Sequence, residues 1–132
     1  FKLEPPKSTG FEYFNLSWLQ QYKPEKYDAA DIQSSLCELT VLSIFQAIKK
    51  YAPETSEIFI CGGGVHNCEL MRRLKSDSFT TASTQSIGLD PDWVEASAFA
   101  WLAMRATKGE FGNLPSVTGA NKYAVLGDIY IP

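Results

Sequence analysis

The sequence predicts an α/β fold in which a short, mostly parallel sheet is covered by helices. Three features of the 132 residues indicate this fold: a long helical stretch before a short β-prone run, three glycines directly after that run, and then a second strand followed by another helix. Helices that alternate with strands are typical of parallel sheets, since each helix carries the chain back across the sheet. Two or three strands make a thin sheet, so we expect some of its strands to be missing from these residues.

The N-terminal part is expected to divide from the rest at about residue 24. Residues 1–24 contain a Pro-rich lead-in segment and a short helix, capped by Asn15 and ended by Pro24. Residues 25–132 are expected to form one α/β portion.

A long helix is predicted from Asp28 to Tyr51, with Pro53 ending it. Apolar residues recur there at steps of three and four, which is typical of one buried helix face. The predicted face consists of Ile32, Leu36, Leu39, Leu42, Phe45 and Ile48.

A buried strand is predicted over residues 57–61, because this run is short, apolar and β-prone. It leads into a glycine turn at residues 62–64. Asn67 is a suitable cap for a short helix that continues to Leu74. Residues 79–82 are predicted to form the second strand.

The last helix is predicted to start at Asp90-Pro91 and to run from Asp92 to about Thr107. No charged residue lies between Glu95 and Arg105, so we expect this helix to be buried on most sides. A loop follows, and the final apolar run at 124–131 is expected either to pair or to pack.

Composition excludes several classes of function. The net charge is -3, and nucleic-acid binding or attraction to a membrane surface would need a basic face. The apolar runs are shorter than the roughly 20 residues that a membrane span requires. Three cysteines are too few, and odd in number, for a disulfide scaffold, which favours the cytoplasm.

The glycine turn is the strongest candidate for a binding site. Glycines at Gly62, Gly63 and Gly64 let the backbone approach a ligand, and amides at the start of the next helix favour phosphate or a nucleotide. No Gly-Lys-Ser/Thr follows, so the motif is not a P-loop. A tight turn without a ligand explains the glycines equally well, but the position after a strand of a parallel sheet favours a ligand.

Glu95 is the second candidate, because its carboxylate heads an otherwise apolar stripe on the last helix. Such a carboxylate is either paired, or lines a cleft and accepts hydrogen bonds from a polar ligand such as a sugar. Cys61, His66 and Cys68 suggest metal ligands, but they lack Cys-x-x-Cys pairing and a fourth ligand. No metal site is therefore predicted, and Cys61 is expected to be a buried apolar thiol.

Several longer motifs occur in a fixed order. They are Pro5-Pro6-Lys7-Ser8-Thr9-Gly10 with Phe14-Asn15, Cys61-Gly62-Gly63-Gly64 with His66-Asn67, Asp90-Pro91-Asp92-Trp93-Val94-Glu95-Ala96, Phe99-Ala100-Trp101-Leu102-Ala103, Asn113-Leu114-Pro115-Ser116-Val117-Thr118-Gly119-Ala120 and Val125-Leu126-Gly127. In these motifs the chain resembles the C-terminal part of the 1,6-anhydro-N-acetylmuramic acid kinases. It departs from them at Phe11-Glu12, where the family commonly has Arg-Glu.

The resemblance implies the two-lobed fold of sugar kinases, actin and the Hsp70 ATPase domain, with this chain as an incomplete second lobe. Such kinases use ATP and Mg²⁺ to open the anhydro ring with water and to phosphorylate O6, which yields N-acetylmuramic acid 6-phosphate in cytoplasmic cell-wall recycling. By resemblance, Gly62, Gly63, Gly64 and Asn67 contact the adenosine of ATP, and Glu95 contacts the amino sugar.

The resemblance also implies that the catalytic residues lie elsewhere. The phosphate loop of the first lobe and the aspartate of an Asp-Thr-Gly-Pro-Gly-Asn motif are both missing from this sequence. We therefore expect a C-terminal fragment that is inactive alone, because phosphoryl transfer needs groups on both sides of the γ-phosphate. A homodimer is expected, and the alternative function is a non-catalytic, self-associating interaction module.

Overall fold

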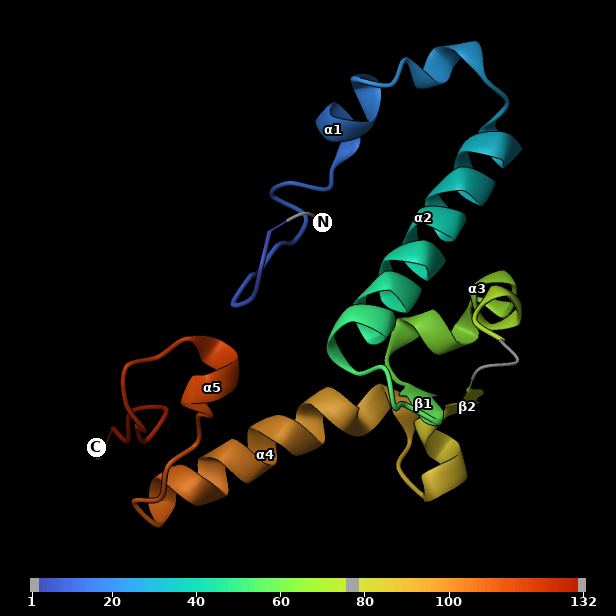
Figure 1. The fold of residues 1–132 in the computed structure, drawn as a ribbon. Helices are drawn as coiled ribbons and strands as arrows, with labels where there is room; N and C mark the ends of the chain where they lie inside the picture. The colour runs from blue at the N-terminus through green and yellow to red at the C-terminus, as the bar shows by residue number, and fades with distance from the viewer. Residues whose placement is uncertain (1–2, 76–78, 131–132) are drawn as a thin grey trace. The chain divides into compact units, whose positions relative to one another are not determined.

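The computed structural model describes residues 3–75 and 79–130 (Figure 1). They form two compact units, one from Thr9 to Asp92 and the other from the residues before Thr9 together with those after Asp92. The predicted α/β class is confirmed, because helices flank a short parallel sheet.

The first helix, α1 (Leu16–Gln20), begins at the predicted cap. The Oδ1 atom of Asn15 accepts a hydrogen bond from the amide of Trp18 at 3.0 Å. The predicted end at Pro24 is wrong, because α1 stops at Gln20 and Pro24 instead opens the 3-10 helix η1 (Pro24–Lys26). Proline suits the first turn of a helix, where its missing amide hydrogen has no partner to lose.

The long helix is confirmed as α2 (Ala29–Tyr51). Its buried face differs from the predicted one at Leu42, which is 47% exposed, whereas Val41 is 3% exposed. Steps of three residues fall short of a full turn, so a stripe built on them winds around the helix. In the C-terminal half of α2 the inner face contains Val41, Phe45 and Ile48, and Leu42 lies about 100° from Val41.

The sheet consists of β1 (Glu57–Ile60) and β2 (Thr80–Ser83), which run parallel as predicted. Glu57 lies opposite Thr80, and Ile60 lies opposite Ser83. The prediction of a fully buried first strand is wrong, since Phe59 is 38% exposed while its neighbours in β1 on either side are half-buried. Successive side chains of a strand point to opposite faces, so one face of β1 lacks a cover among the described residues.

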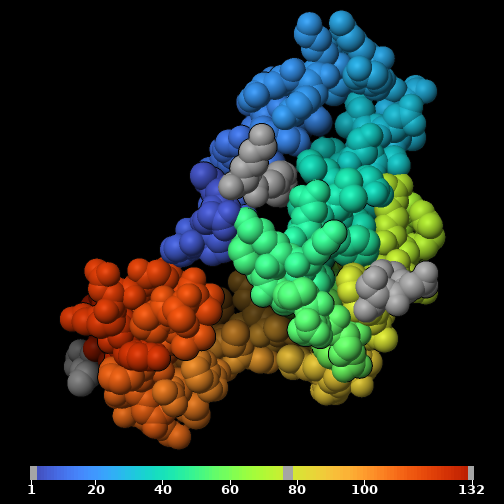
Figure 2. Space-filling view, in the orientation of Figure 1, coloured from blue at the N-terminus to red at the C-terminus, as the bar shows by residue number. Residues whose placement is uncertain are grey.

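The core of the Thr9–Asp92 unit lies where α2 and α3 (Cys68–Arg73) meet the sheet. The helices α2 and α3 lie side by side in both views (Figure 1, Figure 2). Leu74, directly after α3, is completely buried. The ring of Phe45 in α2 packs edge-on against that of Phe79, with centroids 5.3 Å apart, just before β2. These contacts fix α2 and α3 around the loop that follows β1.

Two 3-10 turns complete this unit. The turn η3 (Thr84–Ile87) directly follows β2 and begins with the buried Thr84. The turn η4 (Pro91–Trp93) then precedes the last long helix. Asp90 caps η4 as predicted, because its Oδ1 atom accepts a hydrogen bond from the amide of Asp92 at 2.9 Å.

The last long helix, α4 (Val94–Thr107), is confirmed, but its predicted burial is wrong. No residue of α4 is buried, and the large side chains of Phe99, Trp101 and Met104 are 64%, 50% and 40% exposed. An apolar composition shows that a helix needs a partner surface, but it does not show that neighbouring residues of the chain supply one. The described residues leave α4 without that partner.

The C-terminal residues form the short helix α5 (Pro115–Thr118) and an irregular segment. Residues 124–130 contain no strand, and Ala124 is held by loop contacts instead. Its amide donates to Oδ1 of Asn113 at 2.7 Å, and its carbonyl accepts from the amide of Gly112 at 3.0 Å. The final run therefore does not pair over its described part, and only Ala124 is half-buried there, whereas residues 125–130 are exposed; residue 131 lies outside the described residues. Among residues 3–75 and 79–130, no helix is both long and apolar enough to cross a membrane.

Candidate functional site

The glycine turn (Gly62–Gly64) leaves the end of β1 in a conformation that only glycine adopts without strain. Gly62 has a φ of 69° and a ψ of -170°. Its amide donates to the carbonyl of Pro91 at 2.8 Å, and its carbonyl accepts from the amide of Val65 at 3.1 Å. Both backbone polar groups of Gly62 are therefore hydrogen-bonded, which fixes the turn. The positive φ explains why glycine occupies position 62.

The backbone conformation at position 63 does not require glycine. Its φ is not positive, and a Cβ atom added to Gly63 would meet no other atom within 4 Å. The same space is open at Gly62, whereas a Cβ at Gly64 would make an ordinary contact of 3.6 Å with Leu70. The backbone at positions 62 and 63 is thus accessible to a flat or bulky ligand.

Asn67 ends the 3-10 turn η2 (Gly63–His66) and starts α3, as predicted. Its Oδ1 atom accepts a hydrogen bond from the amide of Leu70 at 3.0 Å. No described residue accepts a hydrogen bond from its side-chain amide, so both N–H groups are available to a ligand.

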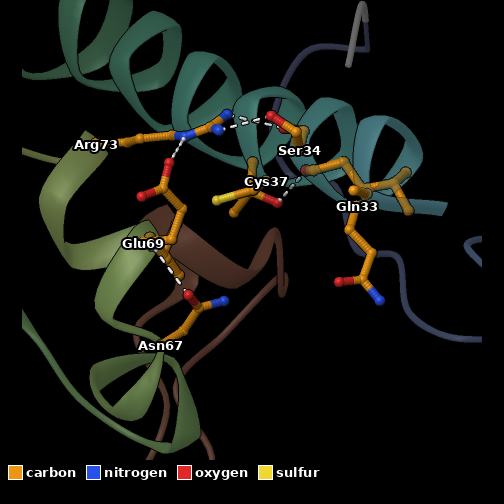
Figure 3. Close-up of a pocket in the computed structure, with 10 residues that line it drawn as sticks. Gln33, Ser34, Cys37, Asn67, Glu69 and Arg73 are labelled. Atoms are coloured by element: carbon orange, nitrogen blue, oxygen red, sulfur yellow. Dashed lines mark hydrogen bonds and ion pairs between the residues drawn. The ribbon is translucent and has the colours of Figure 1, made fainter. Parts of the chain in front are cut away.

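Asn67 also lines an open pocket of about 620 Å³ between α2 and α3 (Figure 3). Gln33, Ser34 and Cys37 project from α2, and Glu69 and Arg73 stand on the opposite wall (Figure 3). The remaining lining residues are Ala30, Leu36, Thr40 and Leu70. Six of the ten lining residues carry polar side chains and the others are apolar, so the pocket offers both kinds of contact to a small molecule.

An acidic side chain on this wall is held in its charged form. Hydrogen bonds from Arg72, which has the larger effect, and from Arg73 lower the pKa of Glu69 from 4.5 to about 2. Arg72 contacts both carboxylate oxygens of Glu69, at 2.7 and 2.8 Å, and Nε of Arg73 lies 2.6 Å from one of them. Glu69 is therefore ionised at neutral pH and its acceptor capacity is largely used.

Comparison with known proteins identifies the family. The model of the anhydro-N-acetylmuramic acid kinases matches residues 1–132. The chain belongs to this family.

Three of the similar proteins, all named anhydro-N-acetylmuramic acid kinase, illustrate the match. The protein of Coxiella burnetii (strain RSA 493 / Nine Mile phase I) is 47% identical over 133 residues, which cover 98% of this chain and 36% of the relative. That of Shewanella pealeana is 48% identical and that of Xylella fastidiosa 46%, each over 98% of this chain. The chain spans 36% of the first of these relatives and a similar share of the others.

The second candidate residue of this family member, Glu95, lies exposed in the first turn of α4. Of the described residues, none makes a hydrogen bond or an ion pair with its carboxylate. The described residues therefore offer the Glu95 carboxylate no partner. Glu95 and the glycine turn belong to different units.

Cys61, His66 and Cys68, the residues that suggest metal ligands, are not brought together in the described part of the chain. His66 pairs with Asp92 instead, with Nε2 lying 3.0 Å from Oδ1. Over residues 3–75 and 79–130, no group of three His, Cys, Asp or Glu side chains is placed to hold a metal ion. The predicted burial of Cys61 is wrong, because the strand ends at Ile60 and the thiol is exposed.

Sequence reasoning missed the pocket and its α2 wall. The polar residues Gln33, Ser34 and Cys37 lie beside the apolar face of α2, where they read as an ordinary solvent-facing flank. The spacing of Glu69 and Arg73 was a visible signal, because residues four apart meet on a helix. The contact of Arg73 with Ser34 joins residues 39 apart, and no local pattern predicts it.

Proposed function

We propose that this chain is the C-terminal part of a sugar kinase that uses ATP to open the ring of 1,6-anhydro-N-acetylmuramic acid and to phosphorylate O6. Water opens the anhydro ring while O6 takes the γ-phosphoryl group of ATP, and the products are N-acetylmuramic acid 6-phosphate and ADP. One observation carries the proposal: a family match over the whole chain coincides with a glycine turn whose backbone is open to a ligand. Residues 25–132 would belong to the second lobe of this kinase.

The nucleotide would lie against the glycine turn. Gly62, Gly63 and Gly64 present backbone rather than side chains, and Asn67 offers its free amide. The adjoining pocket of about 620 Å³ is large enough for a nucleobase and has apolar walls suited to its faces. ATP therefore fits the residues present, and when bound it supplies the phosphoryl group.

The sugar would be contacted by Glu95, whose carboxylate has no partner among the described residues and can accept hydrogen bonds from hydroxyl groups. Among the described residues, no group of three His, Cys, Asp or Glu side chains is placed to hold Mg²⁺ by itself. We assign this chain no metal ligand and no general base, and propose that the catalytic aspartate lies in an N-terminal part of the kinase outside these 132 residues. The proposed setting is the cytoplasm, with which the free thiols of Cys61 and Cys68 agree.

The test combines an intact mass with a turnover assay on the same sample. The full-length kinase should convert ATP and 1,6-anhydro-N-acetylmuramic acid to ADP and the 6-phosphate, and a sample of 14.7 kDa should not. Activity at 14.7 kDa would show that the catalytic groups lie in this chain. A full-length protein that binds neither compound would refute the proposed function.

A self-associating interaction module is the second candidate, and the exposed aromatic side chains of α4 favour it. Such a module, or a homodimeric kinase, would bury Phe99 and Trp101 against a second copy. Sedimentation of the full-length protein with and without Phe99→Ser separates the cases. Dissociation of a dimer by this substitution supports self-association through α4, and an unchanged mass excludes it.

A further inference from the structure

Arg73 joins the two walls of the pocket between α2 and α3. Its Nη1 atom donates to the carbonyl of Ser34 at 2.8 Å, and its Nη2 atom donates to Oγ of the same residue at 2.7 Å. The Nη1 atom also lies 3.1 Å from Oε2 of Glu38. All three contacts reach from α3 to α2, and Figure 3 shows the Arg73 guanidinium spanning the space between the helices.

The guanidinium is also hydrogen-bonded to a residue of its own helix. Its Nε atom donates to Oε1 of Glu69 at 2.6 Å, one helical turn earlier on α3. The side chain of Arg73 is 17% exposed, so these bonds are largely protected from water. A planar group with five donors suits four such acceptors at once, which the single ammonium of a lysine would not.

We infer that Arg73 is a positioning residue that sets the width of the pocket for the nucleobase of ATP. The inference rests on the proposed function, because it assumes that this pocket receives the base. Asn67 and Leu70 stand on the α3 wall, and Gln33 and Cys37 on the α2 wall, so the spacing of the helices decides whether a flat ring contacts both. The amide of Gln33 has no hydrogen-bond partner among the described residues and is available to the edge of the base.

The neighbouring Arg72 provides a matched control. It has the same charge and also contacts Glu69, but its side chain is 67% exposed and makes no hydrogen bond or ion pair with α2 within the described part of the chain. Substitution of Arg72 therefore removes one hydrogen-bonding partner of Glu69 and leaves the contacts of Arg73 with α2 in place.

The experiment measures kcat and the KM values for ATP and for the anhydro sugar in the full-length kinase. Arg73→Met should raise the KM for ATP about tenfold, since it removes several hydrogen bonds from a charged donor. In the same Arg73→Met variant, the KM for the sugar and kcat should change by less than about twofold. Arg72→Met should leave all three values near those of the wild type. Arg73→Lys should recover part of the loss in the KM for ATP. A merely structural role of Arg73 would instead lower kcat and affect both KM values together.

A second variant covers the case in which Arg73→Met does not fold. Ser34→Ala combined with Glu38→Gln removes the hydroxyl acceptor of Ser34 and the charge of Glu38 while it keeps Arg73 and the Ser34 carbonyl, and it should raise the KM for ATP by several-fold. An unchanged KM for ATP in both variants, with a raised one in Asn67→Ala, overturns the role of Arg73 but keeps the nucleotide site. An unchanged KM for ATP in Asn67→Ala as well overturns the proposed function of the glycine turn.

Discussion

The imidazole of His66 contacts both carboxylate oxygens of Asp92, with its Nε2 atom 3.0 Å from Oδ1 and 3.1 Å from Oδ2. This pair, together with the hydrogen bond from Gly62 to the carbonyl of Pro91, ties the glycine turn to the turn that precedes α4. The two side chains are 63% and 56% exposed, so water weakens the pair, and its role is to orient the turn rather than to hold the fold.

Loss of this pair should loosen the glycine turn. We expect His66→Ala and Asp92→Asn each to raise the KM for ATP by about two- to fivefold, the range of an exposed pair. The double variant should be no worse than either single variant, because both remove the same contact. Asp128→Asn, which neutralises an exposed carboxylate after the last helix, serves as the control. Additive effects of the two substitutions would show that the pair does not act as a unit.

Alanine at the two neighbouring glycines should separate stability from binding. Gly62→Ala should lower the free energy of unfolding by about 1–2 kcal/mol, because a Cβ atom is strained at a positive φ. Gly63→Ala should leave the thermal midpoint nearly unchanged, since open space surrounds the added atom. It should nevertheless raise the KM for ATP, because the methyl group occupies the space proposed for the nucleotide. A Gly63→Ala variant with both an unchanged midpoint and an unchanged KM would exclude a nucleotide from this position.

Local patterns predicted the helices and strands well, because capping, periodicity and strand propensity depend on near neighbours. Asn15, Asn67 and Asp90 each accept the expected hydrogen bond from an amide a few residues later. The parallel pairing of β1 and β2 followed from the helix between them.

Burial was predicted less well, because it depends on surfaces distant in the chain. Phe59 and the aromatic side chains of α4 are apolar and exposed, so composition alone gave the wrong environment for both. In the candidate site, the sequence indicated the glycines, Asn67 and Glu95 but not Arg73. The contact of Arg73 with Ser34 forms only when α2 and α3 pack, and it therefore requires the tertiary structure.

Acid should weaken the part of the fold that depends on Glu69. Hydrogen bonds from Arg72 and Arg73 hold the pKa of Glu69 at about 2, below its ordinary value of 4.5. A carboxyl with a lowered pKa in the folded state stabilises that state fully above its unfolded pKa, and this contribution fades as the pH falls toward the folded pKa. The thermal midpoint of Glu69→Gln should therefore lie below that of the wild type at pH 7, and the difference should shrink between about pH 4.5 and 2. A difference that is constant over this range would show that the charge of Glu69 contributes nothing.

Glu95→Gln tests the proposed sugar contact. The substitution keeps the shape of the side chain and removes its charge, so we expect turnover by the full-length kinase to fall about 100-fold or more, as for a carboxylate that accepts a strong hydrogen bond from the reacting sugar. The fold should be unaffected, because no described residue bonds to the Glu95 carboxylate. The control is Glu110→Gln, which removes an equal charge from the ion pair with Arg105 at 2.8 Å and should leave turnover within about twofold. Turnover by Glu95→Gln at the wild-type rate would remove Glu95 from the site, whereas a loss in Glu95→Gln alone would tie the sugar to the start of α4.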